Sequence, residues 1–402
     1  YSEAVVIDAV PPQKRTRGKP LFLTIGPSFT MVIPMLLGSM MTIFGAGSGT
    51  GTYMYTGIIT AFASALFGVL WAYNNIKYTN ISEHEQEQER YNAYGQYLIE
   101  TAAFLKEKYD FNAAVLNKTN ISAAECCKYD ENNHQLWNRN ASQEDFLSVR
   151  LGIGSCPFQV EINIPPKKFS VNRDELADKP QEIKKNFETL YNVPVCIDLL
   201  KNNMVGVVGG QNLEGARQAV LNMVVQIAVN NCYTDVKMAF IYDEKNEGNF
   251  WNFARWLPHV WTSDKKCRLI AAGKQEASDV CYELTKIMRS REENNAAVSD
   301  SDEVKLPHYI IFIESPELLE GELLMKYIMK PRKEYGLTTV FITRQYEQLP
   351  NTCEEIIQND DVFRGMYNIS ESRTKMKEIQ FDTVYADQVE MLARRISGIE
   401  VN

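Results

Sequence analysis

The sequence has little that could hold a metal ion or act as a nucleophile. Its 402 residues include eight cysteines and four histidines, but no Cys-x-x-Cys pair and no His/Cys pair at metal-ligand spacing. Structural zinc sites use four such ligands, usually in closely spaced pairs. No zinc site is therefore expected, and the cysteines are predicted to be reduced thiols of a cytosolic domain. No Ser-His-Asp or Cys-His set can be argued from the sequence either.

An excess of positive charge is also missing. The chain carries a net charge of −9, and residues 1–80 contain five Lys or Arg against two acidic residues, so the remaining 322 residues carry −12. Proteins that bind nucleic acid usually present a basic face to the phosphates. The composition therefore excludes an obvious nucleic-acid partner.

Two stretches, residues 21–44 and 53–73, lack charge altogether. Each is long enough to cross roughly 30 Å of hydrocarbon as a helix. The link between them is uncharged, Lys77 follows the second stretch, and four basic residues precede the first: Lys14, Arg15, Arg17 and Lys19. Because positive charge stays on the cytoplasmic side, we expect a transmembrane hairpin, residues 21–74, with both termini in the cytoplasm. A buried helical hairpin of a soluble protein is the alternative.

A polar, helix-favouring segment follows, and residues 75–140 are predicted to form a helical stalk. Apolar side chains and Thr101 recur in it at alternating spacings of three and four, which predicts a seam for another helix: Tyr91, Tyr94, Leu98, Thr101, Leu105 and Tyr109. Ser122 and Glu125 have the spacing of a capping box. We therefore expect a partner helix from there to about residue 137, packed against the first in an antiparallel hairpin.

Short β-rich runs alternate with helix-length segments in residues 141–402. The predicted strands are residues 193–199, 204–208, 236–242, 268–271, 309–313, 338–342 and 365–369. The predicted helices are residues 213–230, 275–291 and 316–335. This alternation indicates an α/β domain with a mainly parallel sheet and helices on both faces. Residues 1–20 are left as a basic cytoplasmic segment.

A phosphate-binding loop lacks its lysine. Residues 210–217 (GQNLEGAR) follow a predicted strand and keep the glycine spacing of a Walker A loop. Such a loop surrounds the phosphates with backbone N–H groups, reaches them with a lysine and holds Mg²⁺ with a Ser or Thr hydroxyl. Ala216 and Arg217 fill those last two positions. Each lost hydrogen bond to a charged group removes roughly 1.5–3 kcal/mol, so nucleotide affinity should fall about a hundredfold or more.

The second element of an NTPase site is also altered. An apolar strand, residues 310–313, ends in Glu314 where such sites place an aspartate that holds Mg²⁺, and Ser315 stands where a catalytic acid often lies. The two elements together indicate a RecA-like domain with an inactive nucleotide pocket and no catalytic residue. Its candidate residues are Gly209, Gly210, Gly215, Ala216, Arg217 and Glu314.

Two further features have structural and functional readings. Arg344 follows a predicted strand, where NTPase folds place a sensor or an arginine that faces a neighbouring subunit, although a surface ion pair is the favoured interpretation. Trp251, Trp256 and Trp261 concentrate aromatic area in one segment. Such clusters usually pack in a core, and the alternative is a patch for partner docking, because tryptophan is enriched at binding hot spots.

With these residues in place, the chain resembles the EssC/EccC-type membrane ATPases of type VII secretion, a branch of the FtsK/SpoIIIE motors. The resemblance covers nearly the whole chain. It appears in separated strings: residues 23–28 (LTIGPS), 34–37 (PMLL), 136–139 (LWNR), 145–147 (DFL), 150–154 (RLGIG) and 255–261 (RWLPHVW). The last string is the most specific.

The resemblance implies an ATP-driven motor in a bacterial cell membrane that exports small helical-hairpin proteins and effector toxins. The chain would be an internal piece of that motor, its membrane anchor and first, degenerate ATPase-like domain. ATP and Mg²⁺ would be bound by domains further along the protein, with no cofactor in this piece. The implied partners are other type VII membrane subunits, the secreted substrates, lipid and further copies of the chain.

Two other classes of function stay open. A DNA-translocating or conjugative coupling motor shares the fold and the anchor, although the acidic charge argues against it, and salt-dependent DNA binding would support it. A membrane scaffold without motor ancestry would require the loop and strand matches to be accidental. A sheet without RecA strand order would support that reading.

Overall fold

The computed structural model describes residues 1–12, 21–45, 53–166, 174–247, 249–295, 304–370 and 376–401. The fold is mixed α/β, with one long helix and one large sheet. The chain divides into two compact units, Tyr1–Lys108 with Gln159–Phe187 and Tyr109–Phe158 with Glu188–Asn402. The four basic residues before the first apolar stretch, and nearly all of the predicted link, lie outside the described ranges.

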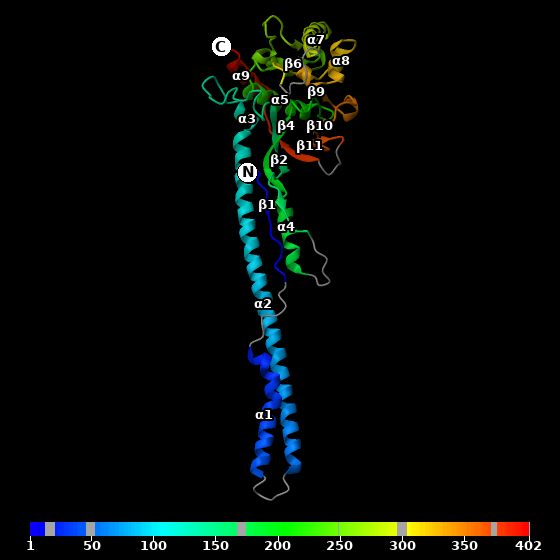
Figure 1. Cartoon of the computed structure of the whole chain (residues 1–402). Coiled ribbons are helices and arrows are strands. Elements are labelled where there is room, and N and C mark those ends of the chain that lie inside the picture. Colours follow the sequence, from blue (N-terminus) through cyan, green and yellow to red (C-terminus); the bar gives the residue numbers. More distant parts are fainter. Residues whose placement is uncertain are drawn as a thin grey trace. The chain divides into compact units, whose positions relative to one another are not determined.

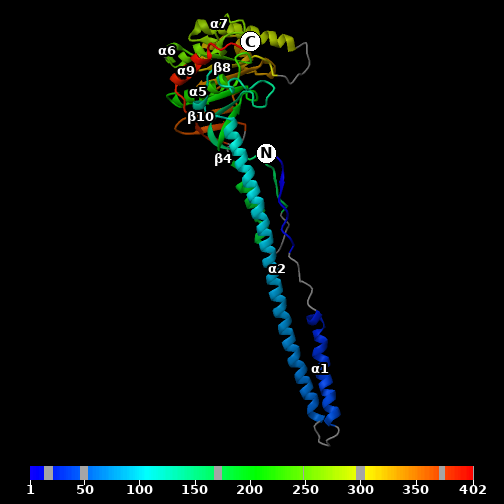
Figure 2. The same cartoon turned by 90° about the vertical axis from the view of Figure 1, so that its left-hand side faces the viewer.

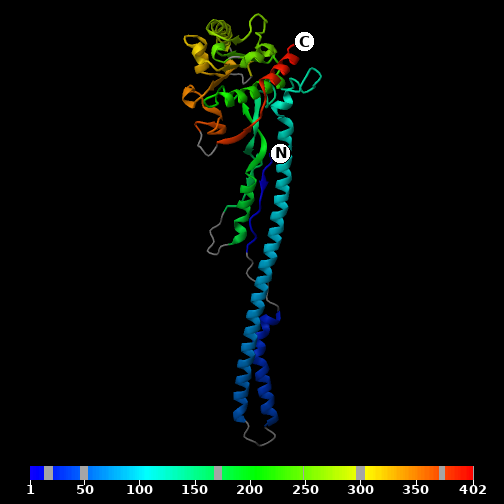
Figure 3. The same ribbon diagram turned by 180° about the vertical axis from the view of Figure 1, so that it is seen from behind.

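In the first unit, two helices run side by side (Figures 1 and 3): α1 (Leu21–Gly45) and the first part of α2 (Tyr53–Thr119). Small residues allow this approach. A Cβ added to Gly26 would lie 1.6 Å from the Trp71 ring, and one added to Gly38 would lie 2.4 Å from the Thr60 methyl group. Glycine at both positions lets the two backbones come close, as at helix interfaces in membranes.

One helical stretch of the described chain, Gly57–Cys126, is long and apolar enough in length and composition to cross a membrane. The apolar part of α1, Thr24–Met40, is shorter. Both helices have exposed large apolar side chains. Phe29 is 51% exposed and Phe62 is 72% exposed. The second predicted span and residues 75–119 of the predicted stalk form one helix, α2.

Much of the seam predicted on the stalk is buried, although Tyr91 is 42% exposed and its hydroxyl accepts from Lys179 at 3.1 Å. Tyr94 and Leu98 are each 4% exposed. The Tyr94 hydroxyl donates to the Asp8 carbonyl oxygen at 2.8 Å, and the Asp8 N–H donates to the Tyr97 hydroxyl at 3.0 Å. An extended N-terminal segment therefore occupies this seam. It contains β1 (Val5–Val6), which pairs in parallel with β3 (Ile162–Asn163). The unit also contains η1 (Glu175–Ala177) and α4 (Lys179–Asn186).

The prediction of a partner helix from Asn120 to about residue 137 is wrong, because only one helical turn forms there. The capping box of Ser122 and Glu125 is confirmed, but α3 (Ala123–Cys126) ends after one turn. Asp130 and Asn133 then accept hydrogen bonds from backbone N–H groups two residues later, at 3.0 and 2.9 Å. Such local bonds compete with helix formation, so the chain turns here instead of continuing as a helix.

The second unit is built on a ten-stranded sheet of order β4-β2-β12-β11-β10-β5-β9-β8-β6-β7. The strands from β10 to β7 pair in parallel, and those from β4 to β10 pair antiparallel. Their bounds are β2 (Ser148–Pro157), β4 (Thr189–Asp198), β5 (Met204–Val208), β6 (Val236–Ile241), β7 (Ile270–Ala271), β8 (His308–Ile313), β9 (Leu337–Thr343), β10 (Glu355–Asn359), β11 (Arg364–Asn368) and β12 (Lys377–Phe381).

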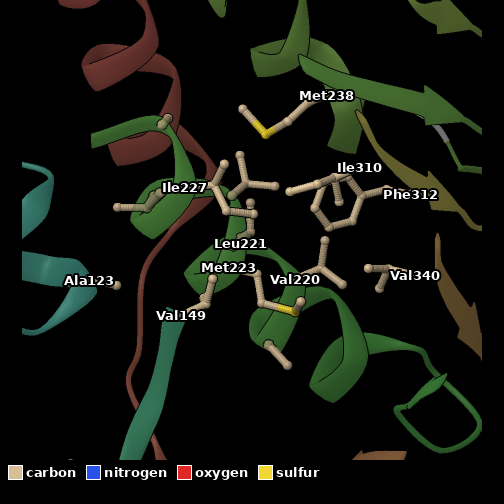
Figure 4. Close-up of a cluster of buried hydrophobic side chains, with 14 of the residues drawn as sticks. Ala123, Val149, Val220, Leu221, Met223, Ile227, Met238, Ile310, Phe312 and Val340 are labelled. Atoms are coloured by element: carbon tan, nitrogen blue, oxygen red, sulfur yellow. The ribbon is translucent and has the colours of Figure 1, made fainter. Parts of the chain in front are cut away.

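Helices cover both faces of the parallel strands, as predicted (Figure 2). Alternate side chains of each strand enter different cores. Phe312 of β8 packs in the core under α5 (Glu214–Asn230) and α9 (Ala386–Ile396), whereas Ile311 and Ile313 pack under α7 (Lys274–Asn295) and α8 (Leu324–Met329). Figure 4 shows α5 side chains meeting Met238, Ile310 and Phe312 of the sheet. Shorter elements are α6 (Glu244–Glu247), η2 (Phe250–Trp256), η3 (Pro258–Val260), η4 (Pro316–Leu319), η5 (Lys333–Tyr335) and η6 (Tyr346–Gln348).

All seven predicted strands are present, and β5 has the predicted bounds. The helix predicted over residues 316–335 was wrong, because the chain forms η4, α8 and η5 in its place. Gly321 adopts a φ of +82°, in the left-handed region, and Pro331 cannot donate a helical hydrogen bond. Each interrupts the helix on one side of α8.

Candidate functional site

The altered loop joins β5 to α5 at the carboxyl edge of the parallel strands. Its backbone is held from the neighbouring strand, since the Gly209 N–H donates to the Thr343 carbonyl oxygen at 3.1 Å. Gly210 has a φ of +72°, which favours glycine. The Leu213 N–H then donates back to the Gly210 carbonyl oxygen at 3.2 Å and closes the turn. Leu213 itself stands at the N-cap of α5 with a φ of +56° and makes no side-chain capping bond.

Close packing explains the other two glycines. A Cβ on Gly215 would lie 1.7 Å from the Asn359 carbonyl oxygen, and one on Gly209 would lie 2.5 Å from the Ala216 Cβ. Asn359, at the end of β10, also donates its side-chain N–H to the Gly215 carbonyl oxygen at 2.9 Å. Contacts within the fold therefore explain why glycine stands at these positions of the predicted phosphate loop, and no bound nucleotide is needed to explain them.

The two substituted positions of the loop have different fates. Ala216 is fully buried in the core, so no cation extends from the lysine position. Arg217 turns toward β8, and its Nε and Nη2 lie 2.9 and 2.8 Å from Oε1 of Glu314. Its guanidinium carbon also lies 4.9 Å from the centre of the Phe250 ring. The residue in the hydroxyl position therefore binds the residue in the aspartate position directly.

Glu314 is held from both sides. Its side chain has no exposed surface, its Oε1 accepts from Arg217, and its Oε2 accepts from the Trp251 indole N–H. Burial raises the pKa of the Glu314 carboxyl, and the charge of Arg217 and the Trp251 bond oppose that rise. A Mg²⁺ ion would have to compete with a guanidinium for this carboxylate. The residues present do not fit Mg·ATP, because the guanidinium of Arg217 already pairs with the carboxylate that would hold the metal ion.

The serine after Glu314 is also hydrogen-bonded within the fold. Ser315 is 2% exposed, and its hydroxyl oxygen accepts the Asp243 N–H at 3.0 Å. It has no carboxylate to activate water. Within the described ranges, no group of three or more His, Cys, Asp or Glu residues is placed to hold a metal ion.

A cavity of about 510 Å³ lies beside this pair at the carboxyl edge. Its volume is in the range of roughly 300–1,000 Å³ that ligand pockets usually have. Charged and polar side chains line much of it, including Lys245 and Glu317 together with Glu314. The remaining lining residues are Leu213, Ser315, Pro316, Ile342, Thr343, Arg344 and Gln348.

Arg344 is exposed in this cavity, and the surface ion pair favoured from sequence is not found among the described residues. Its backbone N–H donates to the Gln348 side-chain oxygen at 3.0 Å, which fixes the turn after β9. The charge of Arg344 also lowers the pKa of Glu314, after the larger effects of Arg217 and Trp251. Arg344 therefore faces the altered site without being paired to it.

The three tryptophans occupy different surroundings. Trp251 is 2% exposed and serves as the hydrogen-bond donor to Glu314, so the core interpretation describes it. Trp256 and Trp261 are partly exposed, and each lies under an arginine, Arg394 at 3.9 Å and Arg268 at 4.5 Å from the ring centre. Docking at these two rings stays a prediction.

Sequence reasoning brought Arg217 and Glu314 to the same edge but did not predict their ion pair. It also missed Asn359, Lys245 and a row of polar residues on α5. The signal for that row was visible, because Gln218, Asn222, Gln226 and Asn230 recur every four residues in an otherwise apolar helix.

No family model matches the chain. Curated relatives do. The ESX secretion system protein EccC of Geobacillus thermodenitrificans is 23% identical over 270 residues, covering 66% of this chain and 18% of that protein. YukB of Bacillus subtilis, also an ESX secretion system protein, is 22% identical over 319 residues, covering 78% and 20%. The type VII secretion system protein EssC of Staphylococcus aureus is 21% identical over 378 residues, covering 92% and 25%.

The curated homologues of this chain are type VII secretion proteins. The chain spans 18–25% of the length of these three homologues. Solved type VII structures are also similar. EssC ATPases 2 and 3 from G. thermodenitrificans give a TM-score of 0.42 at 11% identity, covering 66% of this chain and 50% of that one. EccC ATPases 2 and 3 of Thermomonospora curvata, in complex with a signal sequence peptide, give 0.43 at 13%, covering 68% and 51%.

Proposed function

We propose that this chain is the membrane anchor and a non-hydrolysing, RecA-like domain of a type VII secretion motor. The observation that carries the proposal is the ion pair between Arg217 and Glu314, with a buried alanine beside it at the lysine position. The pair supplies a fixed cation where an active site would use Mg²⁺. The domain then serves as a structural or regulatory element, and ATP with Mg²⁺ is bound by other domains of the intact motor.

The strand order supports RecA ancestry over an accidental scaffold. Apart from the two-residue β7, the parallel strands run β10-β5-β9-β8-β6. One strand, β9, thus separates the loop-bearing strand β5 from the acidic strand β8, which is the order of RecA-like NTPases. The altered loop and Glu314 follow the carboxyl ends of their strands, where ligands bind in open α/β sheets.

ATP hydrolysis by the full 402-residue chain, reconstituted in lipid nanodiscs, tests the proposal. We expect no phosphate release above background and no Mg²⁺-dependent ATP binding at micromolar concentration. The loss of a lysine and a hydroxyl predicts this result, at roughly 1.5–3 kcal/mol for each charged hydrogen bond. Micromolar Mg·ATP binding with turnover would contradict it, whereas binding without Mg²⁺ or turnover would leave the non-hydrolysing domain intact.

The finer membrane arrangement is part of the same proposal. Both α1 and the apolar start of α2 span the bilayer, with the link at residues 46–52 outside the cell and both ends of the chain in the cytoplasm. The close contacts at Gly26 and Gly38 support a packed helix pair. The basic residues at 14–19 support the orientation.

A cysteine accessibility experiment tests this topology. In intact cells, a membrane-impermeant maleimide should label Ser48→Cys. The matched control Glu83→Cys, on α2 beyond the apolar stretch, should react only after permeabilisation. Labelling of both positions, or of Glu83→Cys alone, in intact cells would contradict the two-span arrangement.

The partners follow from the secretion role. We infer that the chain assembles with other type VII membrane subunits and with further copies of itself, and that small helical-hairpin proteins are the cargo of the intact motor. Nucleic acid is not a partner. The names of the relatives, and a similar structure solved with a signal sequence peptide, support this inference. Copurification of the tagged chain with those subunits from native membranes is the expected result.

A further inference from the structure

Helix α5 carries a row of polar side chains through the core. Asn222, Gln226 and Asn230 are 0%, 2% and 7% exposed, and Gln218 continues the row by one turn toward the N-terminus. Residues four apart lie on the same face of a helix. A buried polar side chain lowers stability unless it is hydrogen-bonded, so the partners of this row say what it does.

The row binds backbone carbonyl groups of three other segments, and one of them is β2, whose Leu151 oxygen accepts from Asn222 at 3.4 Å. Gln218 donates to the Val384 oxygen at 2.8 Å, and Asn222 donates to the Asp382 oxygen; both acceptors follow β12. Gln226 donates to the Ile121 oxygen at 2.9 Å, just after the end of α2. Asn230 completes the row by donating to the Gln226 side-chain oxygen at 3.0 Å.

The end of α2 is tied to the same segment after β12. The last carbonyl groups of a helix have no partner within it, and here Arg150 donates to the Asn120 oxygen at 2.7 Å. Arg150 also pairs with Asp382, whose carboxylate lies 2.9 Å from the Arg150 Nε. The same carboxylate oxygen, Oδ2, accepts the Ala123 N–H at 3.3 Å, and the other oxygen, Oδ1, accepts from Arg150 Nη2 at 3.0 Å. Asp382 thus links the end of α2, α3 and α5.

The N-terminal end of α5 lies at the altered site. Arg217 lies in its first turn and grips Glu314 of the sheet. Between these ends α5 is packed on all sides. Figure 4 shows Val220, Leu221 and Ile227 of α5 in one cluster with Ala123 of α3 and with Phe312 and Val340 of the sheet. Interiors packed to this density transmit a shift instead of absorbing it.

We propose that α5 couples the altered site to the end of α2, so that breaking or making the Arg217–Glu314 pair changes how firmly residues 119–126 are held. The paired state draws the first turn of α5 to β8. In the unpaired state that first turn is no longer held to Glu314, and the polar row carries the change to Ile121 and Asp382. An altered nucleotide site would then report to the helix that leads to the membrane. The coupling does not require that any nucleotide bind.

Hydrogen exchange of the full chain in nanodiscs tests the coupling. Glu314→Gln removes the charge from the pair at nearly constant shape. Couplings between sites commonly reach about fivefold or more in an equilibrium constant, so we expect amide exchange in residues 119–126 to accelerate by about that factor. Exchange in α7, which packs in the core on the other face of the sheet, should stay as in the unaltered chain. Should Glu314→Gln fail to fold, Arg217→Gln is measured by the same criterion.

A second variant shows whether the row carries the effect. Gln226→Met keeps the side-chain length but cannot donate to the Ile121 oxygen. In that background we expect Glu314→Gln to add no acceleration at residues 119–126, while its effect near residues 213–217 persists. Lys245→Gln, in the same cavity but without contact to the row, is the matched control and should leave residues 119–126 unchanged.

Three outcomes would overturn the coupling. The first is no acceleration at residues 119–126 in either charge variant. The second is the same acceleration with and without Gln226→Met, since separate sites then act additively. The third is a uniform acceleration across the unit, including α7, which would mean only a general loss of stability.

Discussion

The two edges of the parallel sheet differ in how their polar side chains are exposed. Those at the carboxyl edge lie beside a cavity, and the histidines at the amino edge are buried. At the carboxyl edge, Arg217 and Glu314 form an ion pair beside a cavity, and Arg344 stands exposed. At the amino edge, His308 begins β8, and its Nε2 lies 2.9 Å from the Thr338 hydroxyl oxygen. That hydroxyl donates to the Leu199 carbonyl oxygen at 2.7 Å, so it accepts from the histidine.

A second buried histidine, His259, lies at the amino edge. The His259 Nε2 lies 2.9 Å from the carbonyl oxygen of Asn231, the C-cap of α5. Burial lowers the pKa of His259 to about 4 and that of His308 to about 3, with nearby Lys237 and Arg291 adding to the effect. The two histidines of the amino edge are therefore buried and neutral, whereas the carboxyl edge has an ion pair beside a cavity. The contrast supports the proposal that the carboxyl edge is a ligand site without hydrolytic chemistry.

The largest expected effect is acid destabilisation of the amino edge. Below the usual histidine pKa of about 6.5, the unfolded chain takes up protons that the folded chain does not, so stability falls with decreasing pH. Each histidine contributes about 1.4 kcal/mol per pH unit. The full slope is reached only below pH 6.5, so together they should remove about 4 kcal/mol of unfolding free energy between pH 6.5 and 4.5.

Urea unfolding, followed by tryptophan fluorescence at several pH values, measures this slope. The double variant His259→Gln/His308→Gln keeps a side-chain N–H donor at each site but cannot titrate. Its unfolding free energy should depend much less on pH in this window. An unchanged slope in the double variant would show that other groups control the acid response.

The next effect is an asymmetry at the carboxyl edge. Arg217→Ala leaves the unexposed Glu314 carboxylate without its cation, and breaking a buried pair in this way typically removes about 3 kcal/mol or more. Glu314→Ala should remove less, about 1–2 kcal/mol, because the Arg217 side chain is 22% exposed and can turn to solvent. Chemical denaturation compares the two. Equal losses, or the reverse order, would contradict the burial argument.

A smaller effect is expected from restoring the site. Ala216→Lys/Arg217→Thr returns the ammonium and the hydroxyl and frees the Glu314 carboxylate for a metal ion. Mg·ATP affinity should rise by at least about tenfold, or about 1.4 kcal/mol. Isothermal titration measures it, with Ala216→Lys/Arg217→Ala as the control that lacks the hydroxyl. No gain in the first variant would mean that the loop itself, and not two side chains, excludes nucleotide.

The smallest effect belongs to the exposed cations of the cavity. Lys245→Ala and Arg344→Ala should change the unfolding free energy by no more than about 0.5 kcal/mol, as surface substitutions usually do. Thermal unfolding of the two variants beside Arg217→Ala checks this. A loss comparable to that of Arg217→Ala would show that the open edge is held together by these side chains as well.

Local sequence predicted the parts of the fold whose pattern is strong. The fully buried β5 and β8 read as short apolar runs between polar ends, and the loop at residues 210–217 reads from its glycines alone. Three strands of the ten-stranded sheet were not predicted. β12 is a short run of mixed charge, β2 contains two glycines, and β10 ends in polar residues. Pairing with a neighbour, and not their own composition, makes these segments strands.

The sequence by itself determined that two apolar helices precede an α/β domain, and that its phosphate loop has no lysine or hydroxyl. These are properties of residue order, since spacing and missing functional groups need no folding to be seen. Only the tertiary structure decided that Arg217 takes over Glu314, that the stalk seam holds an extended N-terminal segment, and that α5 reaches the end of α2. Such contacts join residues far apart in the chain, and whether two side chains meet depends on how the whole core packs.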